Sequence, residues 1–135
     1  MERFYIPVRD VMTKQAELVD GLASIREAVK IMNEKKVNTL VVDRRDNKDD
    51  FGLITVNEIA THIIEPNRSL DRSAVYEYMV KPALTVGADK NIRYAIRLLS
   101  RYGETRAIVT ENEHAVGFVT FADMVLHYLE ALGDE

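Results

Sequence analysis

Apolar residues recur at the spacing of one buried helix face in two stretches of the sequence. The i, i+3, i+4, i+7 positions are occupied by Ile25, Ala28, Val29 and Met32, and again by Ile92, Ala95, Ile96 and Leu99. That spacing places the four side chains of each stretch on one side of an α-helix. Ser24 and Glu27 form a capping-box pattern, and Asn91 is a favoured N-cap residue. The pattern therefore predicts helices that begin at Ile25 and Ile92.

Each predicted helix stands between the same kinds of neighbours. A leading segment and a short extended piece precede it, and a strand, a polar turn, a second strand and a closing helix follow. The leading segments end at 10–12 and 77–79, the extended pieces cover 17–19 and 84–86, the strands cover 39–42 and 52–54 or 107–109 and 117–119, and the closing helices cover about 56–64 and 121–132. Each half of the chain is therefore a β-α-β-β-α unit of an α/β (α+β) fold.

The two halves are copies of one pattern. Met12 corresponds to Met79 at an offset of 67, and Gly52 to Gly117 at an offset of 65, because the polar loop that begins at Asp43 is two residues shorter in the second half. We expect a first repeat at residues 1–66 and a second at 67–135, with segment 65–72 as the linker. One such unit would leave a sheet face uncovered, so we expect the repeats to pair with pseudo-twofold symmetry in one compact module.

Composition narrows the classes of function. The chain has 135 residues, a net charge of −4 and no cysteine, which excludes disulfides, thiolate metal sites and a cysteine nucleophile. No basic surplus is present to neutralise a nucleic-acid backbone. No apolar run reaches the roughly 20 residues that span a bilayer, and residues 1–7 lack a signal-peptide core. We expect a cytoplasmic protein without nucleic-acid or membrane partners.

The repeated pattern resembles the CBS domain pair, named for cystathionine β-synthase. The resemblance covers about residues 4–132 and rests on Asp10-Val11-Met12, the apolar strand 39–42 and the repeated Gly-x-x-Thr-x-x-(Asp/Glu). It implies a regulatory module that binds an adenosine-containing ligand in the cleft between the repeats. The ligand classes are AMP, ADP, ATP, S-adenosylmethionine and NAD-type molecules. The resemblance further implies that a conformational change transmits occupancy to a regulated protein, and that no cofactor is required.

The second repeat carries the better candidate site. Thr120 stands where a strand enters a helix, whose free N–H groups suit a phosphate. Asp123 follows one turn later and can accept hydrogen bonds from both ribose hydroxyls, and Gly117 would let backbone approach the ligand. The resemblance to the family further implies that the extended piece lines the adenine pocket. It also implies that the start of the middle strand contacts the phosphate. The expected second-repeat set is Ala83, Leu84, Thr85, Thr105, Arg106, Thr120 and Asp123.

The equivalent first-repeat set makes a weaker site. Its members are Ala16, Leu18, Asn38, Thr39, Thr55 and Glu58. Glu58 replaces the aspartate that usually holds the ribose, and Thr39 stands where Arg106 provides a cation. Both Thr-x-x-acid patterns are also capping boxes, which need no ligand. That alternative stays open from the sequence.

Two further classes of function compete with nucleotide sensing. The first is a ligand-free dimerisation or interaction module, and the second is an enzyme. We expect no enzyme, because the sequence has no Ser/His/Asp set and no P-loop, and no metal, because His62 and His127 lack ligand spacing. The last helix carries more apolar residues than one buried face needs, which predicts a homodimer formed through helices. Those residues are Val125, Leu126, Leu129 and Leu132.

Overall fold

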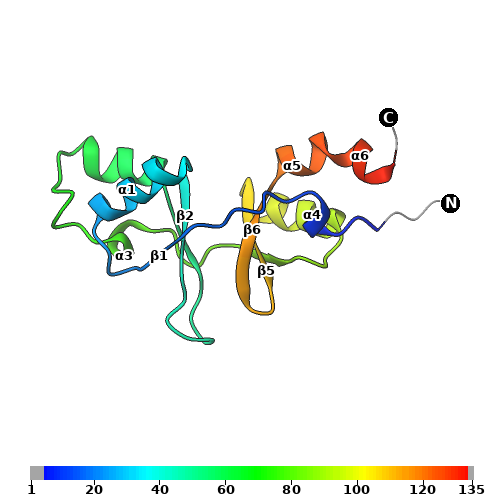
Figure 1. The fold of residues 1–135 in the computed structure, drawn as a ribbon, viewed down its shortest axis with the longest axis horizontal. Coiled ribbons are helices and arrows are strands. Elements are labelled where there is room, and N and C mark those ends of the chain that lie inside the picture. Colours follow the sequence, from blue (N-terminus) through cyan, green and yellow to red (C-terminus); the bar gives the residue numbers. More distant parts are fainter. Residues whose placement is uncertain (1–4, 134–135) are drawn as a thin grey trace. The chain divides into compact units, whose positions relative to one another are not determined.

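The computed structural model describes residues 5–133, so the first four residues of the first repeat and the last two of the second lie outside the described part. The predicted order of elements is confirmed in both repeats (Figure 1). The elements of the first repeat are η1 (Val8–Asp10), β1 (Leu18–Val19), α1 (Ile25–Lys35), β2 (Thr39–Val42), β3 (Gly52–Thr55), α2 (Val56–Ile59) and the π-helix η2 (Ala60–Ile64). Those of the second are α3 (Val75–Tyr78), β4 (Thr85–Gly87), α4 (Ile92–Tyr102), β5 (Arg106–Glu111), β6 (His114–Thr120), α5 (Phe121–Leu126) and α6 (Tyr128–Leu132).

The strands form two separate three-stranded sheets with the same topology. The sheet orders are β1-β2-β3 and β4-β5-β6. In each sheet the first strand pairs parallel to the second, and the second pairs antiparallel to the third. The parallel pairs are joined through α1 or α4, as a crossover connection requires. The expected mixed α/β fold of two β-α-β-β-α repeats is confirmed.

The chain divides into two compact units that do not coincide with the sequence repeats. The β4–β6 unit comprises Met1–Ala16 and Leu84–Glu135, and the β1–β3 unit comprises Glu17–Ala83. Each repeat therefore contributes its strands and the helices after its leading segment to one unit, and its leading segment, with η1 or α3, to the other. The expected division at 66/67 stays a prediction about the duplication of the sequence, whereas the compact units exchange leading segments.

Backbone hydrogen bonds fix the exchanged segments in equivalent ways. In the β4–β6 unit, Thr13 N–H donates to the Phe118 carbonyl at 2.8 Å, and Phe118 N–H returns a bond to the Thr13 carbonyl at 3.0 Å. In the β1–β3 unit, Leu53 and Val80 make the same reciprocal pair at 2.9 and 2.8 Å. The N-terminal segment therefore runs beside β6 (Figure 1).

The two motif glycines admit these leading segments. A Cβ atom at Gly117 would overlap the Thr13 carbonyl oxygen, and one at Gly52 would lie 2.9 Å from Met79 Sδ and 3.3 Å from the Val80 oxygen. We expected Gly117 to let backbone approach a ligand. The backbone that approaches it is that of the leading segment.

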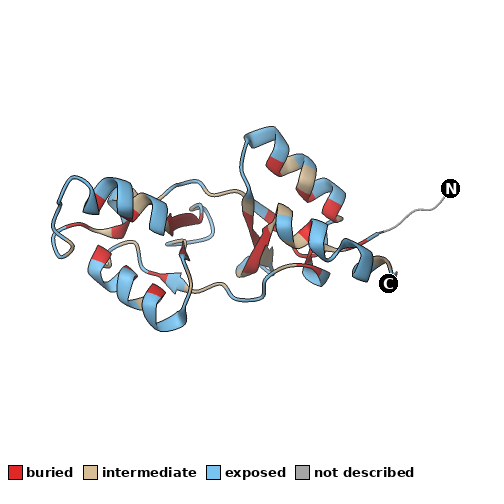
Figure 2. Cartoon of the chain, turned by 90° about the horizontal axis from the view of Figure 1, so that it is seen from above, coloured by how far each residue is buried: buried red, intermediate tan, exposed pale blue. Residues whose placement is uncertain are grey.

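Each unit has its own apolar core, with buried residues on its strands and on the inner sides of its helices (Figure 2). The leading segments belong to these cores: Val8 packs with the α4 face in one unit, and Val75 packs with the α1 face in the other. Burying a side chain of this size contributes about 1.5–3 kcal/mol. The leading segments are thus structural parts of the units that receive them.

The helix starts agree with the sequence, but the closing helices are less regular than expected. Ser24 and Glu27 form the capping box of α1, and the Asn91 side chain accepts a hydrogen bond from Arg93 N–H. The closing helix expected at 56–64 is one α-helical turn followed by a π-helix, and the one expected at 121–132 is interrupted at His127. No helix within residues 5–133 has the length and apolar character to cross a membrane.

Candidate ligand site

The topology of the β4–β6 unit brings most of the second-repeat set to one end of its sheet. Strands β4 and β5 begin at this end and β6 ends there, because β4 and β5 are parallel and β6 is antiparallel to them. Arg106 and Thr120 are direct partners across the β5–β6 ladder. Thr85 pairs with Ile108 on the next strand, and the Leu84 carbonyl accepts a hydrogen bond from Ile108 N–H at 2.9 Å. Thr105 immediately precedes β5.

The Arg106 and Thr120 side chains leave the same face of the sheet, away from the core of the unit. Ala107 and Val119, their neighbours along the strands, belong to the core. Side chains alternate between faces along a strand, and cross-strand partners share a face. Arg106 and Thr120 are both partly exposed. A guanidinium and a hydroxyl therefore stand side by side on the face that does not pack against α4.

Thr120 and Asp123 form the capping box that begins α5. Thr120 N–H donates to Asp123 Oδ2 at 3.0 Å, and Asp123 N–H donates to Thr120 Oγ1 at 3.0 Å. The structure therefore confirms that this motif forms a helix cap. The box uses one carboxylate oxygen, and an ionised carboxylate has about four acceptor positions. The cap alone leaves Asp123 with capacity to accept further hydrogen bonds.

Sequence reasoning missed one residue of the site. The Thr13 hydroxyl lies 3.4 Å from Asp123 Oδ1, the oxygen that the capping box does not use. Thr13 comes from the exchanged leading segment and directly follows Asp10-Val11-Met12. The equivalent residue in the other leading segment is Val80, which has no hydroxyl. That difference between the repeats is the signal that could have identified Thr13.

One member of the second-repeat set belongs to the other compact unit. Ala83 is the last residue of the β1–β3 unit, where its N–H donates to the Phe51 carbonyl at 2.9 Å. Leu84 is the first residue of the β4–β6 unit after the crossing. The part of the set that one unit brings together is Leu84, Thr85, Thr105, Arg106, Thr120 and Asp123, with Thr13 in addition.

In the first repeat the acidic side chain accepts more hydrogen bonds from its own helix cap than Asp123 does. Glu58 Oε1 accepts from both the N–H and the hydroxyl of Thr55, at 2.8 and 2.6 Å. Thr39 pairs with Thr55 across the ladder but is only 5 % exposed, and its hydroxyl donates to Asn38 Oδ1 at 3.1 Å. No cation stands at this position of the strand.

The two remaining members of the first-repeat set are divided between the units. Leu18 lies on β1 of the β1–β3 unit, whereas Ala16 is the last residue of the leading segment in the β4–β6 unit. The first-repeat set therefore differs from the second in that its acid accepts two hydrogen bonds from its own cap and a buried threonine stands in place of the arginine. In chemical terms, the second-repeat set provides a carboxylate, hydroxyls and a guanidinium, which are hydrogen-bonding groups for a polar ligand. Among residues 5–133, no His, Cys, Asp and Glu side chains cluster as a metal site.

Comparison with known proteins identifies the family. The CBS domain pattern matches residues 8–65 and 75–130. A hexameric CBS-CP12 protein from bloom-forming cyanobacteria superimposes with a TM-score of 0.83 at 26% identity, over 95% of this chain and 72% of that one. A conserved CBS domain protein of unknown function from Thermoplasma acidophilum has a TM-score of 0.74 at 30% identity, over 92% and 70% of the two chains.

A structure with ligands shares the fold at lower identity. It is a CBS domain pair in complex with 5′-methylthioadenosine and S-adenosyl-L-methionine, with a TM-score of 0.72 and 23% identity over 92% of this chain and 96% of that one. Among curated proteins, an uncharacterized 33.4 kDa protein of Thermofilum pendens is 22% identical over 97% of this chain, and an uncharacterized protein of Methanocaldococcus jannaschii is 28% identical over 89%. The chain spans 46% and 38% of the lengths of these two relatives. It belongs to the CBS domain family and carries two CBS domains in tandem.

Proposed function

We propose that this CBS pair is a regulatory module that binds an adenosine-containing ligand at the second-repeat set. Proteins with CBS pairs are regulatory modules, and a structural neighbour has been solved with 5′-methylthioadenosine and S-adenosyl-L-methionine. The observation that carries the proposal is the Asp123 carboxylate. One of its oxygens closes the helix cap and the other faces the Thr13 hydroxyl at 3.4 Å, at the sheet end where Arg106 and Thr120 also lie.

Each group of the set has a defined part in this proposal. Asp123 accepts hydrogen bonds from the ribose hydroxyls, each worth about 1.5–3 kcal/mol because the acceptor is charged. Arg106 and Thr120 face the phosphate or other acidic end of the ligand, because a guanidinium forms bidentate hydrogen bonds with such groups. Leu84 and Thr85 line the base.

The asymmetry between the repeats supports this choice of pocket. The Glu58 oxygen already accepts two hydrogen bonds from Thr55, Val80 replaces Thr13, and the buried Thr39 replaces Arg106. We therefore propose that a ligand occupies the second-repeat set first. Its occupancy would be transmitted only if the ligand binds two conformations with different affinity.

A thermal-shift panel tests whether such a ligand exists. The native protein is heated with AMP, ADP, ATP, S-adenosylmethionine, 5′-methylthioadenosine or NAD. A ligand that binds only the folded state at 100 times its Kd stabilises that state by about 2.7 kcal/mol, which raises the melting temperature by several degrees. Absence of a shift with every compound at millimolar concentration would contradict the proposal and favour the interaction module.

A second candidate function, self-association through helices, rests on exposed apolar residues. Leu126 is 77% exposed and Leu129 56% exposed on the closing helices of the β4–β6 unit, and Ile64 is exposed at the corresponding part of the β1–β3 unit. An apolar groove of about 420 Å³ runs between α1 and the closing helices of the β1–β3 unit, with Val29 and Val56 in its walls. Equivalent helix faces exposed in both units fit a second copy of the chain, so we propose a homodimer.

A further inference from the structure

A pocket in the β1–β3 unit lies apart from both candidate sets. It has a volume of about 570 Å³ and is located where β1 and β2 end, whereas Thr39 and Thr55 mark the opposite end of the same sheet. Its walls come from the loop after β1, the end of β2 and the residues around α3. The lining residues are Asp20, Gly21, Leu22, Val42, Arg45, Tyr76, Met79 and Lys81.

Two apolar residues that line the pocket, Leu22 and Tyr76, are largely exposed, and hydrogen bonds fix their backbone. Leu22 is 81% exposed and Tyr76 54% exposed. Leu22 N–H donates to Asp20 Oδ1 at 2.8 Å, and Tyr76 N–H donates to the Gly21 carbonyl at 2.9 Å. Single exposed apolar residues are common, but two that line one pocket with Met79 form an apolar recess open to solvent. The backbone bonds fix the positions from which these side chains project.

The second copy of the fold shows that this apolar recess is not a structural requirement. The residue equivalent to Leu22 is Asp89, and the residue equivalent to Tyr76 is Arg9. Arg9 is paired with Glu111 at 3.6 Å. The same backbone positions therefore accept charged side chains in the β4–β6 unit. The fold itself therefore does not require a leucine and a tyrosine at these positions.

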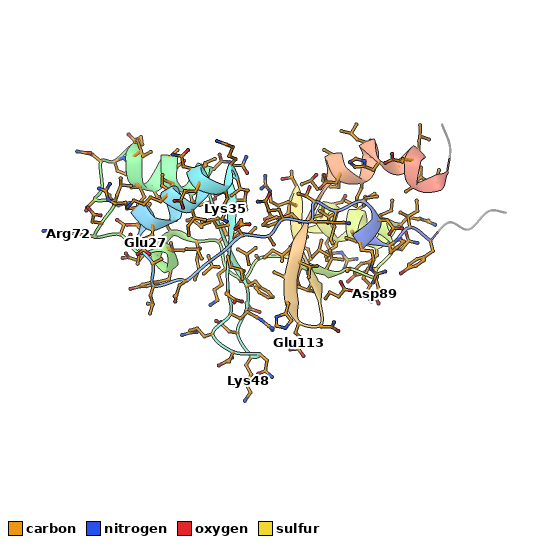
Figure 3. The ribbon with its side chains drawn as sticks, viewed as in Figure 1. Glu27, Lys35, Lys48, Arg72, Asp89 and Glu113 are labelled. Carbon is orange, nitrogen blue, oxygen red and sulfur yellow. The ribbon has the colours of Figure 1, made fainter. Side chains whose placement is uncertain are left out.

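A small cluster of charges borders the pocket. Asp49 Oδ1 lies 2.8 Å from Lys81 Nζ, and Asp49 Oδ2 lies 3.2 Å from Arg45 Nε. The loop that carries Arg45 and Asp49 extends beyond the sheet, with Lys48 at its tip (Figure 3). Two cations share this one carboxylate, and the carboxylate of Asp20 is engaged by the Leu22 N–H. The contacts with Asp49 hold Lys81 and Arg45 in position, and an anionic group at the pocket mouth could contact both cations.

We propose that this pocket binds a small molecule with a flat apolar body and one anionic group. The body lies against Tyr76, Leu22 and Met79, and the anion meets Lys81 and Arg45. A volume of about 570 Å³ is within the ordinary range of small-molecule sites, about 300–1,000 Å³. Aromatic rings and a thioether favour planar aromatic ligands, and cations at the rim favour a carboxylate, sulfonate or phosphate.

The probe for this pocket is 8-anilinonaphthalene-1-sulfonate, an aromatic anion that fluoresces in apolar surroundings. The full chain is titrated with the dye as wild type, as the double variant Leu22→Asp/Tyr76→Arg, and as Lys81→Met. The double variant introduces the residue types found at the equivalent positions of the other unit. We expect saturable binding to the wild type, weakened at least fivefold in the double variant and about tenfold in Lys81→Met, because a charge-assisted contact is lost. Saturating S-adenosylmethionine should leave dye binding unchanged.

Lys14→Met is the matched control, since Lys14 occupies the position equivalent to Lys81. It should bind the dye like the wild type. Equal affinity in the wild type and the double variant would overturn the proposal, because the dye would then bind elsewhere. Absence of saturable dye binding to the wild type would also overturn the proposal. Unchanged dye affinity in Lys81→Met would overturn the proposed contact between Lys81 and an anionic group of the ligand. Thermal melts check that the variants are folded, and Lys81→Met keeps the test decisive if the double variant is not.

Discussion

Replacing Gly117 by alanine tests whether the exchanged leading segment is an integral part of the β4–β6 unit. The new Cβ atom would overlap the carbonyl oxygen of Thr13, so the leading segment or β6 has to move. That carbonyl accepts from Phe118 N–H at 3.0 Å, and Thr13 N–H donates back at 2.8 Å. The substitution therefore acts on the two hydrogen bonds that hold the segment against the strand.

The expected cost follows from these contacts. Two backbone hydrogen bonds are worth about 1–3 kcal/mol together, and overpacking of a close contact costs about 1–3 kcal/mol. We expect Gly117→Ala to lower the free energy of unfolding by about 2–6 kcal/mol. At an unfolding entropy of about 2.1 cal/mol/K per residue, this lowers the melting temperature by roughly 7–21 °C for a chain of 135 residues.

The equivalent variant Gly52→Ala is the control. Its Cβ atom would meet Met79 Sδ at 2.9 Å and the Val80 oxygen at 3.3 Å, and the flexible methionine can move aside. We expect a cost of about 1 kcal/mol or less for a contact that a flexible side chain can relieve. Urea denaturation gives both values, and hydrogen exchange at Thr13 and Phe118 should accelerate in Gly117→Ala. Equal losses in the two variants, or exchange that stays slow at both amides, would refute the close contact.

Three further predictions concern a cap, a carboxylate and the assembly. Ser24→Ala removes the capping box of α1 and should cost about 1 kcal/mol of unfolding free energy in urea denaturation, with no effect on nucleotide affinity. Lys81 and Arg45 hold the pKa of Asp49 well below its usual range, so its contribution to stability is complete above the unfolded pKa of about 3.9 and declines as the pH falls toward the folded value. The melting temperature of Asp49→Asn should therefore lie below that of the wild type at pH 7, and the gap should narrow below pH 4; a constant gap would contradict the ion pairs. Leu126→Lys should convert a homodimer into a monomer of 15.4 kDa by light scattering, and a wild type that is already monomeric at 100 μM would contradict the proposed dimer.

Much of the local structure could be predicted because it depends on local chemistry. Ser24 and Asn91 cap their helices as the pattern indicates, and the Thr55 and Thr120 boxes form where a strand enters a helix. Strands β5 and β6 also form a hairpin around the polar turn that the sequence indicates. These features are determined by residues close in sequence or by a short hairpin.

The exchange of leading segments could not be predicted from the repeat. An offset of 67 shows which residues are equivalent, but not whether Val8 packs on its own repeat or on the other, since both offer the same apolar helix face. The sequence pattern predicts a ligand contact at Gly117, because the atom that excludes a side chain there, the Thr13 oxygen, is more than a hundred residues away in the chain. Thr13 was missed as a neighbour of Asp123 for the same reason.

The proposal that the second-repeat set binds the ligand depends most on Asp123. Isothermal titration with the compound that gives the largest thermal shift is performed on the wild type, Asp123→Ala and Glu58→Ala. Both variants remove a capping-box acid at an equivalent helix start, so they share the cost to the helix and differ in the set that they disable. Loss of charge-assisted bonds worth about 1.5–3 kcal/mol should weaken binding ten- to a hundredfold in Asp123→Ala, and Glu58→Ala should stay within about twofold of the wild type. Unchanged affinity in Asp123→Ala, or a loss confined to Glu58→Ala, would contradict the account.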